Sequence, residues 1–280
     1  MAAGQPDASI SEPGEMAAGQ PDGGEPEPQP IFMQILEKPV SVIGQIDYAN
    51  RYLFVVEVHA LKGERHPYRA CGGALIASNL VLTAAHCLCE PTPGQTIRSD
   101  SSQCLTRGWI RVRRSSTANG SGRMGEYTGD VSIHPRFQLV LDTKGAVVSS
   151  HADLAVIHLK PPVPQDFGPV RLASEEAWVG EVLSAVGYGF IEDVGAMDIW
   201  RRFSQEQVQA PAGDDRFLFG SMDNAAYKGD TGGPCLRETF YGLELVGISQ
   251  RGLGLTPTFT NIVPYRKWLD EQIRLASGKP

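Results

Sequence analysis

Three short segments of the sequence hold the residue types that nucleophilic catalysis requires. The first ends in His86 after an apolar run, the second places Asp153 at the start of an apolar run, and the third is a glycine-dense turn around Thr231. An imidazole can take the proton of a hydroxyl nucleophile, and a carboxylate can fix the tautomer of that imidazole. The backbone N–H groups of a glycine turn can bind the developing oxyanion. Together the segments predict acyl transfer through a hydroxyl nucleophile.

Taken singly, each segment has a structural explanation that is more common than the catalytic one. A histidine at a strand end is more often structural, an aspartate can cap a turn, and a glycine-rich hexapeptide more often marks a tight loop. Their occurrence together, in this order, favours the catalytic interpretation. His151 and Asp153 are two residues apart. No further ligand spacing supports a metal site there, so we expect no metal and no cofactor.

The elements that must position these residues are expected to be β-strands. Apolar and β-branched runs, closely spaced and separated by Gly and Pro, are typical of an all-β sandwich or barrel. The expected strands are 52–58, 74–76, 80–83, 154–157, 182–186, 243–248 and 258–262. The Ser-, Gly- and Thr-rich stretch 88–150 is expected to form surface loops. Tyr265, Trp268, Leu269 and Ile273 have helical spacing and predict one C-terminal helix.

The charge of the chain is concentrated in its N-terminal segment. The 280 residues have a net charge of −7, and the first thirty contain six acids and no Lys or Arg. The rest is nearly neutral, which argues against a nucleic-acid-binding protein. Residues 1–40 predict a disordered leader, more simply a solvated tail than a propeptide or tether, and residues 41–280 a single domain. The basic run 111–114 is expected to be a solvated strand face rather than an anion site, and no apolar run is long enough to span a membrane.

The motifs resemble those of the chymotrypsin/trypsin family of serine endopeptidases over roughly residues 42–277. Residues 82–87 (LTAAHC) resemble the family's histidine motif, 153–156 (DLAV) its aspartate motif, and 229–234 (GDTGGP) its nucleophile motif. This resemblance implies an all-β fold of two packed antiparallel six-stranded β-barrels with a C-terminal helix. It also implies an active site in the cleft between the barrels and a protein or peptide substrate. We expect a monomer.

The resemblance assigns a role to each residue of the site. His86 is the general base, and Asp153 orients its imidazole. The N–H groups of Gly229 and Thr231 form the oxyanion hole, and Ser249 is expected to hydrogen-bond Asp153.

Thr231 stands where the family has serine. It keeps the hydroxyl, but β-branching stiffens χ1 and adds a methyl group near the reacting atoms. Misplacing a reacting atom by about 1 Å can cost around 100-fold in rate. Threonine nucleophiles otherwise use their own N-terminal amine as base, and Thr231 is internal. We therefore expect an endopeptidase that acts through an acyl-enzyme, and the alternative is a catalytically impaired pseudoprotease that serves as a binding or regulatory module.

The resemblance places Ala225, Lys228, Gln250 and Arg251 in the substrate pocket. Trypsins have an aspartate six residues before the nucleophile, and this chain has Ala225 there. We therefore do not expect cleavage after Lys or Arg, and a small or apolar P1 side chain is the default.

Activation is a further departure from the family, in which a newly freed N-terminus pairs with the aspartate before the nucleophile. That aspartate is Asp230, and Val42 resembles the new N-terminus. Val42 follows Ser41 rather than Lys or Arg. Either an unusual protease activates the chain or Asp230 has another partner.

Five cysteines leave one thiol unpaired if the others form disulfides. The family resemblance pairs Cys71 with Cys87, and proximity in sequence pairs Cys89 with Cys104, which leaves Cys235. Disulfides indicate an oxidising compartment. No signal peptide is visible at the N-terminus, and we still expect a secreted or periplasmic protein.

Overall fold

Six antiparallel strands of the N-terminal half close into the first of two β-barrels. In the computed structural model their order is β10-β4-β3-β2-β6-β7, and β7 pairs with β10 to complete the ring. The strands are β2 (Val55–Leu61), β3 (Pro67–Ala77), β4 (Leu80–Thr83), β6 (Arg107–Arg113), β7 (Met124–Ile133) and β10 (Ala155–Lys160). The structure describes residues 1, 44–61, 67–89, 97–114, 124–143, 147–191, 196–197, 200–213, 215–221, 231–250 and 257–278.

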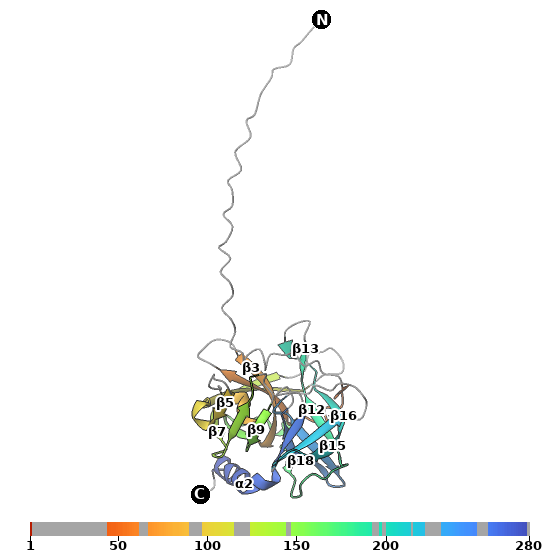
Figure 1. Ribbon diagram of the computed structural model, residues 1–280. Helices are drawn as coiled ribbons and strands as arrows, with labels where there is room; N and C mark the ends of the chain where they lie inside the picture. The colour runs from red at the N-terminus through yellow and green to blue at the C-terminus, as the bar shows by residue number, and fades with distance from the viewer. Residues whose placement is uncertain are drawn as a thin grey trace.

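A second ring of six antiparallel strands forms the other barrel. Its order is β15-β12-β17-β18-β19-β16, and a pairing of β16 with β15 closes it. The strands are β12 (Val182–Gly187), β15 (Arg202–Pro211), β16 (Arg216–Ser221), β17 (Pro234–Thr239), β18 (Gly242–Ser249) and β19 (Thr258–Asn261). Two strands add to its edges: β1 (Gln45–Ile46) pairs with β15, and β11 (Arg171–Leu172) pairs with β18. The expected fold of two six-stranded antiparallel barrels is confirmed, and Figure 1 shows them next to each other.

Short elements connect the two barrels and extend their surface. Three strands, β5 (Ile97–Asp100), β8 (Gln138–Leu141) and β9 (Val147–His151), form a small sheet, and β13 (Phe190–Ile191) pairs with β14 (Ala196–Met197). The 3-10 turns are η1 (Ala85–Leu88), η2 (Ser101–Gln103), η3 (Gln165–Phe167) and η5 (Val263–Tyr265). Residues 2–40 of the expected leader lie outside the described residues.

The expected C-terminal helix is confirmed as α2 (Arg266–Ala276), which follows η5 and lies at the lower edge of the molecule in Figure 1. Its buried side chains are Leu269 and Gln272. The Gln272 side-chain oxygen lies 3.0 Å from Nε2 of His158 on β10, and the Asn79 amide donates to the carbonyl of Ala276. The helix is thus attached to the first barrel. Within the described residues, no helix is long and apolar enough to cross a membrane.

The stretch 88–150 does not consist of loops, and that prediction is wrong. It contributes β6 and β7 to the first barrel and all of the small sheet. Alternate residues of β6 are buried, but three of the four positions flanking them carry arginines, so the run is not apolar enough to predict a strand. In β7 a Cβ at Gly129 would lie 2.3 Å from the carbonyl oxygen of His158. Glycine serves close strand approach there rather than a turn.

Two of the three arginines in the basic run 111–114 do not lie on a solvated strand face, which corrects a second expectation, and the third, Arg114, is 40% exposed. The side chains of Arg111 and Arg113 are only 24% and 18% exposed, and both guanidinium groups pair with the buried carboxylate of Glu57 on β2. Glu57 is directly opposite Arg111 in the antiparallel register of β2 and β6. The arginines therefore compensate a buried charge in the barrel wall.

The other expected strands are present, with shifted ends. Strand β2 begins at Val55 rather than at residue 52. The N–H groups of Arg51 and Tyr52 both donate to the carboxylate of Asp47, so a turn occupies these positions. Asp47 is itself paired with the fully buried Arg201. This ion pair fixes the chain before the first barrel strand.

Candidate active site

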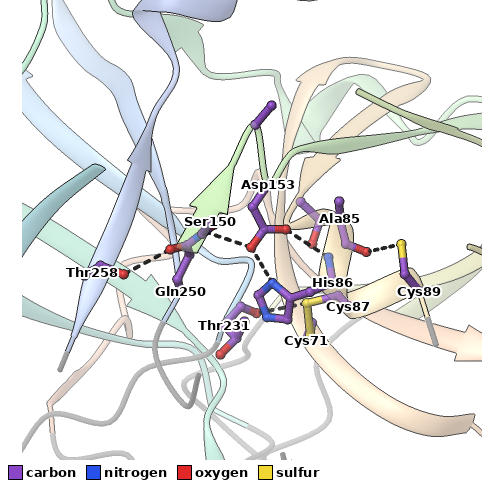
Figure 2. Close-up of polar contacts among 12 residues, drawn as sticks. Cys71, Ala85, His86, Cys87, Cys89, Ser150, Asp153, Thr231, Gln250 and Thr258 are labelled. Carbon is purple, nitrogen blue, oxygen red and sulfur yellow. Dashed lines mark hydrogen bonds and ion pairs between the residues drawn. A yellow bond between two sulfur atoms is a disulfide. The ribbon is translucent and has the colours of Figure 1, made fainter. Parts of the chain in front are cut away.

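The residues predicted for catalysis come from both barrels. His86 lies in the 3-10 turn η1 directly after β4, and Asp153 lies between β9 and β10 of the first barrel. Thr231 precedes β17 and Gln250 follows β18 in the second barrel. Figure 2 shows the imidazole of His86 with Asp153 on one side and Thr231 on the other. The fold therefore brings together three residues that are far apart in the sequence.

His86 and Asp153 form a buried pair. Nδ1 of His86 lies 2.5 Å from Oδ2 of Asp153, and the backbone N–H of His86 donates to Oδ1 at 2.9 Å. The two side chains are 1% and 0% exposed. Because a carboxylate only accepts hydrogen bonds, Nδ1 carries the proton, and the neutral imidazole has its lone pair on Nε2. This is the tautomer that a general base needs.

The Asp153 carboxylate is ionised at neutral pH. Burial by itself raises its pKa, but the attraction to His86 when that ring is protonated and the hydrogen bonds from His86 and Gln250 lower it by more, so the net pKa is below the usual value. A buried carboxylate without such partners would instead become neutral. The surroundings of Asp153 therefore preserve the charge that stabilises an imidazolium.

Gln250 donates to the same carboxylate from the second barrel. Its Nε2 lies 2.8 Å from Oδ2 of Asp153 and 3.1 Å from the hydroxyl of Ser150, and its Oε1 accepts from the hydroxyl of Thr258 at 3.0 Å. The residue is fully buried. The family resemblance implies that Gln250 lines the substrate pocket, and that role stays a prediction. The structure places its amide against Asp153, and Figure 2 draws this contact.

The turn just before Asp153 is held by residues that the sequence analysis does not assign to the site. Ala152 has a left-handed φ of 49°, and its N–H donates to Oδ2 of Asp215 at 2.8 Å and to the Tyr265 hydroxyl at 3.1 Å. The Tyr265 hydroxyl donates to Asp215 at 2.5 Å. Burial and the neighbouring carboxylate raise the pKa of Tyr265 well above its usual range, so the phenol keeps its proton. Asp215 and Tyr265 thus fix an otherwise unfavourable backbone conformation.

The turn that carries Thr231 is attached to the first barrel. The half-buried Thr231 accepts a hydrogen bond at its carbonyl oxygen from the N–H of Gly72 at 2.7 Å, and this oxygen lies 3.9 Å from Sγ of Cys87. The next residue, Gly232, has φ 84°, and a Cβ there would lie 2.5 Å from both the Gly72 carbonyl and the Thr83 hydroxyl. Only glycine fits this position, so the glycine-dense motif meets a local packing requirement.

Several predicted site residues lie outside the described residues: Val42, Ala225, Lys228, Gly229, Asp230 and Arg251. The oxyanion hole, the pocket and the activation contact therefore stay predictions. Ser249 is buried on β18, its backbone bonds the turn at Gly232 and Gly233, and its contact with Asp153 likewise stays a prediction.

Both expected disulfides are confirmed. Cys71 is bonded to Cys87, and Cys89 to Cys104. Cys235 is buried and is the cysteine that lies outside the two disulfides. The first bridge joins β3 to the turn that carries His86, and the carbonyl of Thr231 lies against it. The bridge therefore lies where the histidine segment meets the turn that carries Thr231.

Two closed barrels, with a buried His–Asp pair beside the glycine-dense turn that carries Thr231, define a chymotrypsin-type fold. The family model described as Trypsin matches residues 44–269, and the chain belongs to this family of peptidases.

Known proteins resemble the chain at moderate identity. The vitellin-degrading protease of Bombyx mori is 25% identical over 229 residues, which cover 73% of this chain and 76% of that protein. A trypsin of Sarcophaga bullata is 25% identical over 240 residues, which cover 74% of this chain and 84% of that protein. A solved structure described as "Structure of GrC" superposes with a TM-score of 0.59 at 15% identity and covers 84% of this chain and 100% of its own. That last likeness supports the fold alone.

Proposed function

We propose that the protein is an endopeptidase in which Thr231 is the nucleophile, His86 the general base and Asp153 the group that orients the base. The observation that carries the proposal is the buried pair of His86 and Asp153, with 2.5 Å between Nδ1 and Oδ2. This pair selects the tautomer with a basic Nε2, and the ionised carboxylate stabilises the imidazolium that forms during the reaction.

In the proposed reaction, Nε2 of His86 takes the proton from Oγ1 of Thr231 as that oxygen attacks the substrate carbonyl carbon. The N–H groups of Gly229 and Thr231 donate to the oxyanion of the tetrahedral intermediate. The imidazolium then gives its proton to the leaving amine, and the peptide C–N bond breaks. Water attacks the resulting threonyl ester with His86 again as base, which releases the acid and restores the hydroxyl.

The substrate is proposed to be a protein or peptide with a small or apolar P1 residue. Ala225 supports this, because it stands where trypsins have a pocket aspartate. Lys228 and Arg251 are proposed as further pocket residues. A library of peptides that vary only at P1 tests the preference, and faster cleavage after Lys or Arg contradicts it.

The pseudoprotease is the second candidate, and the β-branched side chain of Thr231 is what favours it. In that case the chain would bind a partner through the same cleft without cleaving it. The geometry of His86 and Asp153 would then persist without a nucleophile that can use it.

Three variants at one position separate the two candidates. Wild type, T231A and T231S are compared on denatured casein and on a fluorophosphonate probe. The endopeptidase predicts measurable wild-type turnover that T231A abolishes, and about 100-fold faster turnover for T231S because the methyl group is removed. If wild type equals T231A on both reagents while T231S gains activity, the endopeptidase is rejected and the binding module is supported.

Domain limits, activation and location are proposed on related grounds. Residues 1–40 are proposed as a leader and 41–280 as the protease domain, with cleavage before Val42 followed by pairing with Asp230. The two disulfides support an oxidising location, secreted or periplasmic. Mass spectrometry of the N-terminus of active protein tests the cleavage site.

A further inference from the structure

We propose that Gln250 is a positioning residue for catalysis, whose amide N–H holds the Asp153 carboxylate in the plane that receives the Nδ1–H of His86. The inference rests on the proposed function of the His86–Asp153 pair, and it gives Gln250 a role different from lining the substrate pocket. Oδ2 of Asp153 is the shared atom, because it lies 2.5 Å from Nδ1 of His86 and 2.8 Å from Nε2 of Gln250.

The orientation of the Gln250 amide follows from the chemistry of its partners. The ionised carboxylate of Asp153 has no proton to donate, so the NH₂ group and not the oxygen of the amide must face it. On the other side the hydroxyl of Thr258 donates to Oε1 at 3.0 Å. The second N–H is directed at the Ser150 hydroxyl at 3.1 Å. All three contacts agree on one amide orientation, and the fully buried side chain has no exposed alternative.

The backbone of Asp153 is fixed by a separate set of contacts. The preceding N–H, of Ala152, is held by Asp215 and Tyr265, and the N–H of His86 binds the other carboxylate oxygen. Removing the Gln250 amide therefore leaves the segment in place and changes the hydrogen bonding at Oδ2. Without Gln250 the carboxylate keeps the two donors of His86, one at each oxygen, but loses the second donor at Oδ2, so its rotation about χ2, which is soft for aspartate, is less restricted.

The Gln250 N–H also affects how strongly the charge of Asp153 raises the proton affinity of the His86 imidazole. A donor at Oδ2 offsets part of the carboxylate charge, so its loss leaves a more strongly negative neighbour beside His86 and favours the protonated imidazole. The other titratable groups near the turn are Asp215 and His151, and Nδ1 of His151 lies 3.8 Å from Oδ2 of Asp215. They are the same in every variant considered below, so a change in His86 titration reports on Gln250.

The test uses Q250M, which keeps the length of the side chain and removes the donor. Its matched control is T258V, which removes the hydroxyl that contacts the amide oxygen and leaves the donor to Asp153. We expect Q250M to lower kcat about 10-fold to 100-fold, the value of a hydrogen bond to a charged group, with KM nearly unchanged. In ring ¹H–¹⁵N NMR, the midpoint of the His86 titration is expected to move up by about half to one pH unit. T258V should match wild type in both.

A rise in KM at constant kcat would assign Gln250 to the substrate pocket and overturn the proposal. A folded Q250M whose His86 midpoint lies within about 0.2 pH unit of wild type would do the same. NMR needs no turnover, so it tests Gln250 even if Thr231 proves not to be a nucleophile.

The second variant, Q250E, covers the case in which Q250M does not fold. Its protonated carboxyl can donate to Asp153 as the amide does, and its ionised form cannot. Because a buried carboxyl beside another carboxylate has a raised pKa, we expect near-normal His86 signals at low pH and a new alkaline transition that wild type lacks. Titration curves of Q250E and wild type that run parallel would reject the positioning role.

Discussion

The first barrel contains two buried pairs of histidine and carboxylate, and their surroundings differ. His86 Nδ1 lies 2.5 Å from Asp153, which also accepts hydrogen bonds from the Gln250 amide and from the backbone N–H of His86, both neutral donors. His59 Nε2 lies 3.2 Å from Glu57, which also pairs with two arginine guanidinium groups. Both carboxylates are fully buried. The presence of a buried His–carboxylate pair is therefore not what distinguishes a catalytic site.

The pKa of both carboxylates is lowered, but different partners lower it. Burial raises the pKa in both cases. At Glu57 the hydrogen bonds from His59 and Arg113 and the permanent charge of Arg113 outweigh burial. At Asp153 the compensation comes from His86 and the Gln250 amide. Since an arginine stays protonated, Glu57 is neutralised whatever the state of its histidine.

This difference indicates what makes the His86 pair suited to catalysis. Among the described residues the cationic partner of Asp153 is the His86 imidazole, so a proton that arrives on His86 is stabilised by a carboxylate charge that no arginine of that part of the chain already neutralises. The ring of His59, in contrast, packs against Trp109 with 4.2 Å between centroids, and the Arg111 guanidinium covers the same indole. His59 belongs to a packed ionic cluster in the barrel wall.

The largest effect is expected at the catalytic pair. In D153N the side-chain amide can donate to Nδ1, which selects the wrong tautomer of His86, and kcat/KM should fall about 10⁴-fold, as in the family's model system. The loss in unfolding free energy should be much smaller than the increase in activation free energy that corresponds to this loss of rate. Peptide turnover and a urea melt measure the two quantities. A rate loss below tenfold would mean that Asp153 does not set the tautomer.

The next effect concerns the structural pair and falls on stability. E57Q leaves Arg113 and Arg111 in the barrel wall without the carboxylate they share, and breaking a buried ion pair from one side costs about 3–5 kcal/mol. Urea unfolding should show this loss, while kcat per folded molecule stays within about twofold. A stable E57Q with reduced turnover would contradict the separation of the two pairs.

Much of the fold could be predicted because its strands have local apolar patterns. Residues 80–83, 182–186 and 243–248 all lie in observed strands. β6 and β7 were missed, since arginines alternate with the buried residues of β6 and glycines interrupt β7. These two strands are stabilised by contacts with other strands: Arg111 of β6 pairs with Glu57 opposite it on β2, and Gly129 of β7 leaves room for the backbone of His158 on β10.

The candidate site shows the same limit. His86 and Asp153 lie in contiguous motifs, so their chemistry could be recognised locally. The residues that hold Asp153 lie elsewhere in the chain: Gln250 directly follows β18 of the second barrel, and Asp215 lies in the short connection from β15 to β16. No local pattern marks either as a partner of Asp153, and only the packing of the barrels brings them together.

A third histidine, His134, is expected to reduce the stability of the fold at a higher pH than the two His–carboxylate pairs do. Burial, with the positive charges of Arg136 and His151, lowers the pKa of His134 from 6.5 to about 4. The unfolded chain therefore takes up a proton first, and about 2–3 kcal/mol of stability should be lost as the pH falls from 6.5 to 4. The pKa values of Asp153 and Glu57 are also lowered, but the stability that these carboxylates contribute is lost only as the pH falls below their ordinary pKa values of 3.8 and 4.5.

Urea midpoints across this pH range measure the slope, and H134N is the control. The Asn oxygen can replace Nδ1 as acceptor for the Arg136 N–H, and it does not titrate. The slope between pH 6.5 and 4.5 should flatten in H134N and persist in E57Q. If E57Q flattens it instead, His134 is not its source.

The smallest effect is expected at His59. H59F keeps a ring against Trp109 and loses the hydrogen bond to Glu57, but Glu57 retains both arginines. Nδ1 of His59 is buried and has no hydrogen-bond partner among the described residues, so its removal partly offsets the loss. We expect a change in unfolding free energy of about 1 kcal/mol or less by urea denaturation, and unchanged turnover. A loss as large as that of E57Q would show that the imidazole, and not the arginines, compensates Glu57.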